Sequence, residues 1–129
     1  MLRLSLVLVV VGFINVGTSH ASDRPLTDSE KKIIANRYGE RLKDPLSAQY
    51  RWHNLIKSAS STPNKMVYCF QVNAKNSYGA YVGFHTVLGT VTHRNGTVVE
   101  YSYEMGAQSN PIMNDSASEF CDISRYTFQ

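Results

Sequence analysis

The strongest constraint on the fold is a succession of three strand-like segments with no helical segment between them. Residues 66–72 (MVYCFQV) are apolar apart from one glutamine, which is typical of a central strand. Residues 80–92 are also rich in β-branched side chains, and residues 97–103 follow directly after Asn95-Gly96, which strongly favours a tight hairpin. Because parallel strands need long crossovers, this order predicts an antiparallel meander.

A helix is predicted before these strands. Thr27 and Glu30 have the spacing of a capping box, in which each side chain bonds the backbone amide of the other residue. Pro45 ends the helical pattern by Asp44, and the same pair can open a second short turn. The apolar positions recur at four-residue steps and form one face: Ile34, Tyr38 and Leu42.

The remaining elements complete an α+β fold. Alternation from Tyr50 to Lys57 predicts a strand, residues 58–64 have the composition of a loop, and residues 114–121 predict a short C-terminal helix capped by Asn114 or Asp115. We therefore expect an N-terminal helix packed on a meander sheet of three or four antiparallel strands. A length of 129 residues fits one such domain, over residues 22–129.

The first 21 residues have the pattern of a cleaved secretory signal. Arg3 gives a basic start, residues 4–14 are almost entirely apolar, and Ser19 and Ala21 supply small side chains before a cleavage point after Ala21. The apolar run is shorter than the roughly 20 residues that a membrane span needs. No cysteine lies near the cleavage point, so no lipid anchor is expected. The pattern predicts a periplasmic or secreted protein without a transmembrane span after cleavage.

The net charge and the two cysteines further limit which kinds of protein this chain can be. A net charge of +3 without any long basic run is too small to indicate a nucleic-acid partner. Two cysteines, Cys69 and Cys121, in an exported chain suggest a disulfide, because the compartment outside the cytoplasm is oxidising. Buried thiols and a reactive thiol are the alternatives, and the apolar neighbours of Cys69 argue against a reactive one.

The spacing of the histidines and of the strand carboxylates gives little support for a metal site or a catalytic site. The histidines of the exported part, His53, His85 and His93, show no ligand spacing typical of a zinc site. Glu100 and Glu104 lie too far apart along one strand to act as a pair of glycosidase carboxylates. We therefore expect no catalytic residue, no metal and no cofactor.

The most distinctive segment is the loop at residues 73–81. Such a mixture of amides, a lysine, a hydroxyl and tyrosines can bind an anion, a glycan or a protein edge. It can equally be a structural turn, in which asparagines bond their own backbone and glycine adopts a positive φ. The candidate binding residues are Asn73, Lys75, Asn76, Ser77, Tyr78 and Tyr81.

Aromatic side chains form a second notable pattern. Tyr101 and Tyr103 alternate with Glu100 and Ser102, so one face of that strand is aromatic, and Trp52 lies at strand parity with Tyr50. Such a face is either part of the core or part of an interface, and we expect the core.

Two segments resemble a family of small exported proteobacterial proteins of largely unknown function. Residues 43–51 (KDPLSAQYR) resemble the family pattern KDPxSAxFR, and residues 69–84 (CFQVNAKNSYGAYVGF) resemble C-G-x-V-N-A-K-N-S-[YF]-G-G-Y-x-G. Phe70 and Ala80 stand where the family has glycine. The resemblance implies an envelope or periplasmic address, and it implies no activity and no catalytic residue.

These features favour a non-enzymatic binding or interaction module of the cell envelope, whose partner is an envelope protein or a small ligand. One alternative is a small hydrolase, or an inhibitor of one, with His85, His93 and residues 73–77 around a cleft. It requires these side chains to converge. Another alternative is an accessory component of a secretion or envelope machine.

Overall fold

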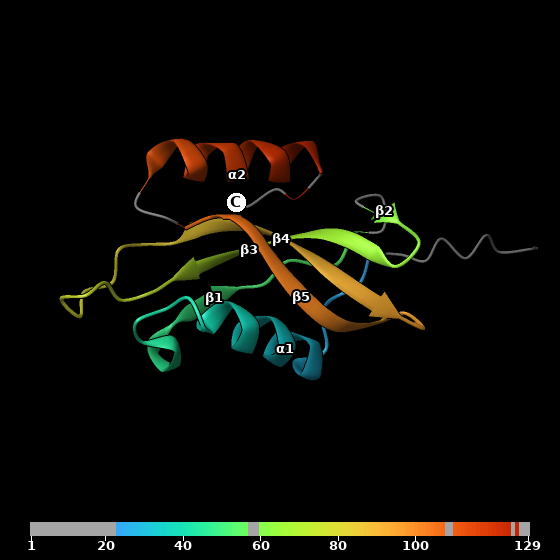
Figure 1. Ribbon diagram of the computed structural model, residues 1–129, viewed down its shortest axis with the longest axis horizontal. Helices are drawn as coiled ribbons and strands as arrows, with labels where there is room; N and C mark the ends of the chain where they lie inside the picture. The colour runs from blue at the N-terminus through green and yellow to red at the C-terminus, as the bar shows by residue number, and fades with distance from the viewer. Residues whose placement is uncertain (1–22, 57–59, 108–109, 125, 127–129) are drawn as a thin grey trace, which may run out of the picture.

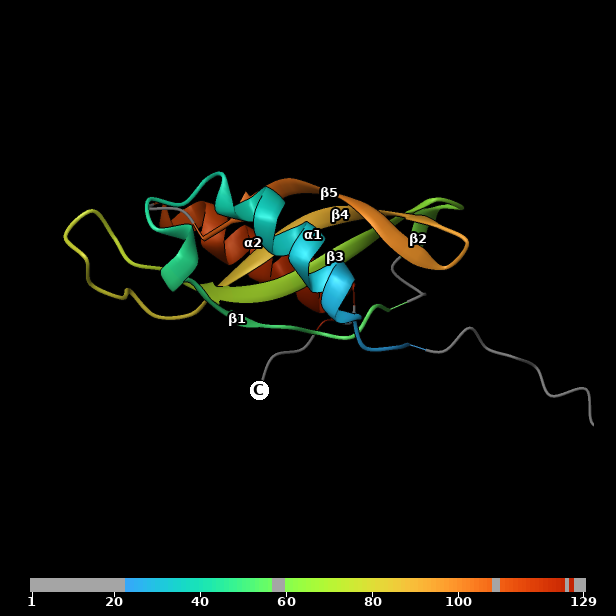
Figure 2. The ribbon, with the colours of Figure 1, turned by 90° about the horizontal axis from the view of Figure 1, so that it is seen from below.

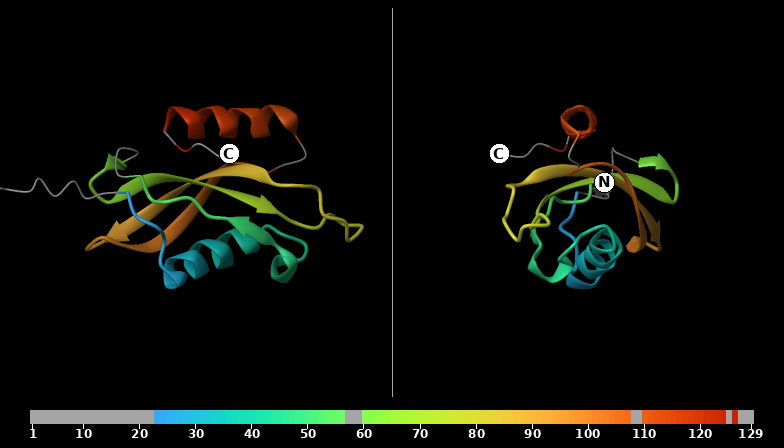
Figure 3. Two further views of the ribbon diagram at one scale, coloured as in Figure 1. Left: turned by 180° about the vertical axis from the view of Figure 1, so that it is seen from behind. Right: turned by 60° about the vertical axis from the view of Figure 1, so that its left-hand side comes forward.

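The protein folds as a twisted antiparallel sheet between two helices (Figure 1). The computed structural model describes residues 23–56, 60–107, 110–124 and 126. Helix α1 (Asp28–Gly39) packs against one face of the sheet, and helix α2 (Pro111–Ile123) covers part of the opposite face (Figure 3). The expected α+β fold is therefore confirmed. The signal-like segment at residues 1–21 lies outside the described residues.

The sheet follows the predicted meander. Its strand order is β1 (Gln49–Arg51), β3 (Lys65–Asn73), β4 (His85–Arg94) and β5 (Thr97–Gly106), and each neighbouring pair is antiparallel. The short strand β2 (Ser60–Thr62) pairs with the beginning of β3, whereas β1 pairs with its end. β3 is thus a central strand, as its apolar sequence predicted.

Several boundaries differ from the sequence-based expectation. The strand predicted from Tyr50 pairs with β3 only as far as Arg51, because the backbone amide and carbonyl of His53 then bond the Tyr68 hydroxyl instead of a neighbouring strand. Part of the loop predicted at residues 58–64 forms β2, since residues 60–62 reach the exposed edge of β3. Helix α2 begins earlier than predicted, at Pro111, and its cap is Asn110, whose Oδ1 accepts a hydrogen bond from the amide of Ile112.

Helix α1 begins as its capping box predicted and ends sooner than expected. The amide of Glu30 donates to the Thr27 hydroxyl, and the amide of Thr27 donates to the Glu30 carboxylate. The helix ends at Gly39, which is buried where the chain turns back. A Cβ at Gly39 would lie 3.2 Å from Cβ of Pro45, so glycine lets the next segment approach closely. That segment is the 3₁₀ turn η1 (Pro45–Ser47), which leads into β1.

The face of the sheet that α1 covers carries an aromatic core. Phe70 of β3 lies at its centre, with ring centroids 5.4 Å from Tyr38 of α1, 5.4 Å from Trp52 and 5.9 Å from Tyr101 of β5. Tyr101 is 1 % exposed, so the aromatic face of β5 belongs to the core. Gly89 of β4 makes room for Tyr101, because a Cβ there would collide with the tyrosine ring.

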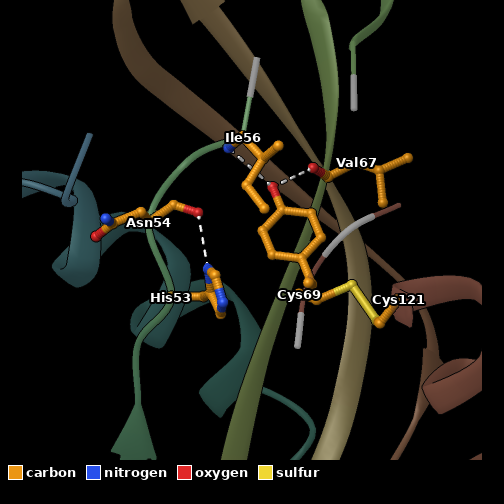
Figure 4. The surroundings of a disulfide bond; sticks show 7 residues. His53, Asn54, Ile56, Val67, Cys69 and Cys121 are labelled. Atoms are coloured by element: carbon orange, nitrogen blue, oxygen red, sulfur yellow. Dashed lines mark hydrogen bonds between the residues drawn. A yellow bond between two sulfur atoms is a disulfide. The ribbon is translucent and has the colours of Figure 1, made fainter. Parts of the chain in front are cut away.

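The opposite face is closed by the disulfide between Cys69 and Cys121. It joins β3 to α2 across 52 residues of sequence, and both cysteines are buried (Figure 4). Just beyond α2, the hydroxyl of Tyr126 donates to the carbonyl of Val67 and accepts from the amide of Ile56. The predicted disulfide is confirmed, and together these bonds fix the C-terminal part of the described chain onto the sheet.

A buried carboxylate fastens α1 to the β4–β5 hairpin. Glu30 is fully buried, and its side chain accepts hydrogen bonds from the Arg24 guanidinium at 2.7 and 2.8 Å, and from the amides of Thr27 at 2.9 Å and Val98 at 2.7 Å. Arg24 also donates to the carbonyl of Gly96 at the hairpin turn. We call the residues Arg24, Thr27, Glu30 and Val98 the Glu30 corner.

The charge of Glu30 is stabilised in place. Burial acts to raise the pKa of its carboxyl group, but the hydrogen bonds from Arg24, Thr27 and Val98 outweigh burial and lower the pKa to about 2. Glu30 therefore remains ionised at any physiological pH. Since β5 is the last strand in the order, the bond to Val98 also satisfies one backbone amide on the open edge of the sheet.

Candidate functional site

The two segments that resemble the exported family come together at one end of the molecule. Residues 73–84 extend beyond β3 and β4 as a long loop, and residues 43–51 lie beside it as η1 and β1 (Figure 2). Two side-chain hydrogen bonds help to join them: the Tyr81 hydroxyl donates to the carbonyl of Ser47 at 2.7 Å, and the Asn73 side-chain amide donates to Gln49 at 3.2 Å. We call these two segments the loop end.

Asparagine side chains hold the loop in a defined conformation. Oδ1 of Asn76 accepts hydrogen bonds from the amides of Tyr78 at 2.9 Å and Ala80 at 3.1 Å, and Oδ1 of Asn73 accepts from the amide of Gly83 at 2.9 Å. Gly79 has φ of 79°, a conformation that side chains other than glycine rarely adopt. The structural role considered for this loop is therefore present, and the two asparagines perform it.

The same loop presents apolar side chains to solvent. Tyr78 is 94 % exposed and Leu46 of η1 is 98 % exposed, so both side chains lie almost entirely in solvent. Val82 and Tyr81 are about half exposed, at 53 % and 43 %. A rigid backbone thus carries four apolar or aromatic side chains outward from one end of the molecule.

Cations lie on aromatic rings at this end. The guanidinium of Arg51 lies 3.7 Å from the ring centroid of Phe84, and Nζ of Lys75 lies 5.3 Å from that of Tyr81. Within the described residues neither cation forms an ion pair with a carboxylate. Stacking on the rings limits the motion of both side chains while their charge stays available to a partner.

The six residues predicted for binding therefore divide by role. Asn73 and Asn76 shape the loop, and Tyr81 attaches it to η1. Lys75 lies over the Tyr81 ring, and Ser77 and Tyr78 are exposed. Tyr78 and Lys75 remain the best candidates for contact with a ligand.

Leu46, Val82 and Arg51 are candidates that the sequence reasoning did not find. Leu46 had a weak signal, since a large apolar side chain in a three-residue turn has little chance of reaching a core. Arg51 alternates with Tyr50, which places it on the opposite face of β1 from the aromatic core.

An open groove lies beside this end. It has a volume of about 340 Å³ and runs between the second half of α1 and η1. Pro45, Leu46 and Tyr50 line one side, and Gly39 and Ala35 line the other. The groove adds a concave apolar surface next to the exposed Leu46 side chain.

The histidines do not gather around this loop. His85 and His93 occupy the two ends of β4, so about 26 Å of strand separates them. His53 packs edge-on against the ring of Tyr126, with centroids 5.1 Å apart. The convergence of His85 and His93 that a hydrolase reading requires is not found.

The described parts of the chain meet neither the requirements of a metal site nor those of a membrane-spanning helix. No three histidine, cysteine or acidic side chains there come close enough together to hold a metal ion. Among the described helices, none is both long enough and apolar enough to cross a membrane.

Comparisons with protein-family models, curated proteins and solved structures each find no match to this chain.

Proposed function

We propose that the protein is a non-enzymatic interaction module of the bacterial cell envelope and that the loop end is its binding surface. The observation that carries this proposal is the exposure of Leu46 and Tyr78, at 98 % and 94 %, on a segment whose backbone is held by internal hydrogen bonds. A pre-ordered loop loses little conformational entropy when a partner binds.

The chemistry of the surface fits a protein partner. Tyrosine and arginine are enriched at the centres of protein interfaces, where an aromatic ring provides contact area and a polar end tolerates water. Tyr78 is free to be buried by a partner, and Arg51 and Lys75 supply charge beside it.

The envelope address rests on the sequence. Residues 1–21 have the signal pattern, and the two segments that resemble the exported family are the ones that form the loop end. A role as an accessory component of a larger envelope machine is a special case of the same proposal, in which the machine is the partner.

The test is a crosslinked pull-down from the envelope fraction of the host, with the tagged protein expressed at its native level and the eluate analysed by mass spectrometry. Lys75→Ala with Tyr78→Ala should abolish capture of the partner. The free energy of unfolding should change by less than about 0.5 kcal/mol, because both side chains are at least partly exposed.

A matched control removes similar side chains elsewhere. Lys32→Ala with Val99→Ala takes an exposed lysine from α1 and a partly exposed apolar group from β5, and capture should persist. Equal capture by the Lys75/Tyr78 variant and by the wild type would refute the loop end as the binding surface.

A further inference from the structure

Helix α2 presents an apolar stripe that no other part of the described chain covers. Ile112 is 72 % exposed, Ile123 is 71 % exposed and Phe120 is 52 % exposed. Their spacings of eight and eleven residues place them within about 80° of each other around the helix. Only Ala117 and Cys121 of this helix are buried, on the side that faces the sheet.

An acidic row runs along α2 beside this stripe. Asp115, Glu119 and Asp122 are exposed and follow one another at steps of four and three residues, so they form a line on the helix. They are the only charged residues of α2, which therefore has a net charge of −3. The outer surface of the helix is thus apolar along one line and acidic along the next.

The loop end has the complementary character. Its charged residues are Lys43, Asp44, Arg51 and Lys75, a net charge of +2, and its exposed apolar or aromatic side chains are Leu46, Tyr78, Tyr81 and Val82. Helix α2 thus combines exposed apolar side chains with negative charge, and the loop end combines them with positive charge. Opposite potentials on two apolar surfaces favour their association and fix its orientation.

The two surfaces cannot meet within one molecule. Helix α2 lies against the face of the sheet, whereas the loop extends past the end of β3 and β4 (Figures 1 and 3). A contact between them therefore requires two copies of the chain.

We propose that α2 of one copy docks on the loop end of a second copy. The proposal rests on the proposed function, since it names a partner for the same loop end. The contact is heterologous, because each copy contributes a different surface and keeps the other one free. Such contacts extend into a ring or a chain of molecules unless something blocks one of the surfaces.

The first measurement is sedimentation velocity of the protein recovered from the envelope fraction, from about 10 μM to about 1 mM. At about 0.05 M salt we expect the mean sedimentation coefficient to rise with concentration. At about 0.5 M salt the rise should shrink, because screening shortens the range of attraction between exposed charges. A monomer throughout this range would overturn the proposal.

Two variants then test the geometry. Lys75→Ala with Tyr78→Ala alters the loop end, and Ile112→Ser with Ile123→Ser alters α2. Each variant alone should lose association by at least about 10-fold, since each removes one half of the contact. All four side chains are at least partly exposed, so both variants should fold, which circular dichroism and melting can verify.

A mixture of the two variants gives the decisive result. The α2 surface of the first variant and the loop end of the second remain intact, so an equimolar mixture should form a 1:1 complex and grow no further. A mixture that stays monomeric, or a variant that still associates alone, would overturn the heterologous contact.

This outcome is separable from that of the proposed function. If the wild-type protein stays monomeric while Lys75→Ala with Tyr78→Ala abolishes capture of a different envelope protein, self-association is refuted and the interaction module stands. If the wild-type protein associates as predicted but the same variant neither weakens association nor changes capture, the loop end itself is refuted.

Discussion

The Glu30 corner and the loop end both use polar side chains to bind backbone groups, but they place them in opposite environments. At the corner, a charged carboxylate is fully buried and bonds residues as distant as Val98. At the loop end, the neutral amide of Asn76 is exposed and bonds residues two and four positions away. The first arrangement joins separate elements of the fold, and the second shapes a single loop.

The difference in environment implies that losing a hydrogen-bond partner costs more free energy at the corner than at the loop end. A buried charge that loses a partner keeps its full desolvation penalty, whereas an exposed amide that loses a partner bonds water instead. Changes at the corner should therefore lower the stability of the fold, and changes at the loop end should mainly alter what the protein binds.

Removing the disulfide should cause the largest loss of stability. It should alter neither the Glu30 corner nor the loop end. Cys69→Ala with Cys121→Ala removes a crosslink between residues 52 positions apart in the sequence. In the chain-entropy model, this crosslink lowers the conformational entropy of the unfolded chain and so stabilises the folded protein by about 4 kcal/mol. Urea unfolding should show a loss of this size. Because the disulfide joins β3 to α2 and includes no residue of either region, whatever part of the protein remains folded should still capture its partner.

Glu30→Gln should lower the free energy of unfolding by about 3 kcal/mol, because the Arg24 guanidinium and the amides of Thr27 and Val98 lose a charged acceptor. The control is Glu40→Gln, which breaks an exposed ion pair with Arg37 at 3.2 Å and should change stability by less than about 0.5 kcal/mol. Equal effects of the two substitutions would contradict a special role for the corner.

The corner also predicts how stability responds to acid. The pKa of Glu30 is about 2 in the folded protein and near its ordinary value of 4.5 in the unfolded chain, so the unfolded state binds the proton first. Its contribution of about 3 kcal/mol is complete above pH 4.5 and is lost as the pH falls towards 2. Urea unfolding between pH 2 and pH 6 should show this decline in the wild type and a weaker one in Glu30→Gln.

Asn76→Ala should lower the free energy of unfolding by only about 1 kcal/mol, since its two hydrogen bonds lie at the surface. The local effect should be larger: amide hydrogen exchange at Tyr78 and Ala80 should speed up, and partner capture should weaken. Asn54→Ala, at an exposed position outside the loop end, serves as the control and should change neither. Unchanged exchange at both amides would show that Asn76 does not order the loop.

Tyr101→Phe should give a small change of the opposite sign. Among the described residues, the Tyr101 hydroxyl is a buried polar atom without a hydrogen-bond partner, unlike the fully bonded carboxylate of the corner. Removing it leaves the ring packing in place and should raise stability by about 1 kcal/mol in thermal unfolding. Tyr68→Phe is the contrasting variant. It should destabilise, because the Tyr68 hydroxyl donates to the carbonyl of His53 at 2.6 Å.

Much of the fold was predictable because its determinants are local. The capping box at Thr27, the hairpin at Asn95-Gly96 and the apolar run of β3 each act within a few residues, and all three are confirmed. The position of α2 was less predictable, since its start depends on Asn110 as a cap rather than on residues inside the helix.

The candidate site was predictable only in part. The sequence drew attention to residues 73–81, yet it did not separate the asparagines that shape the loop from Tyr78, which the loop exposes. The contact between η1 and this loop was also not predictable, because the hydrogen bond from Tyr81 to Ser47 joins residues 34 positions apart in the sequence.

By itself, therefore, the sequence indicated the main helices and strands, the antiparallel order of the strands and a disulfide between the two cysteines, because short-range periodicity, turn chemistry and residue count favour these features. Only the tertiary structure decided which side chains the packing covers. Glu30 became a buried anchor because Arg24 and Val98 reach it from elements far apart in the chain. Leu46 and Tyr78 became a surface because no described element packs over that end of the sheet.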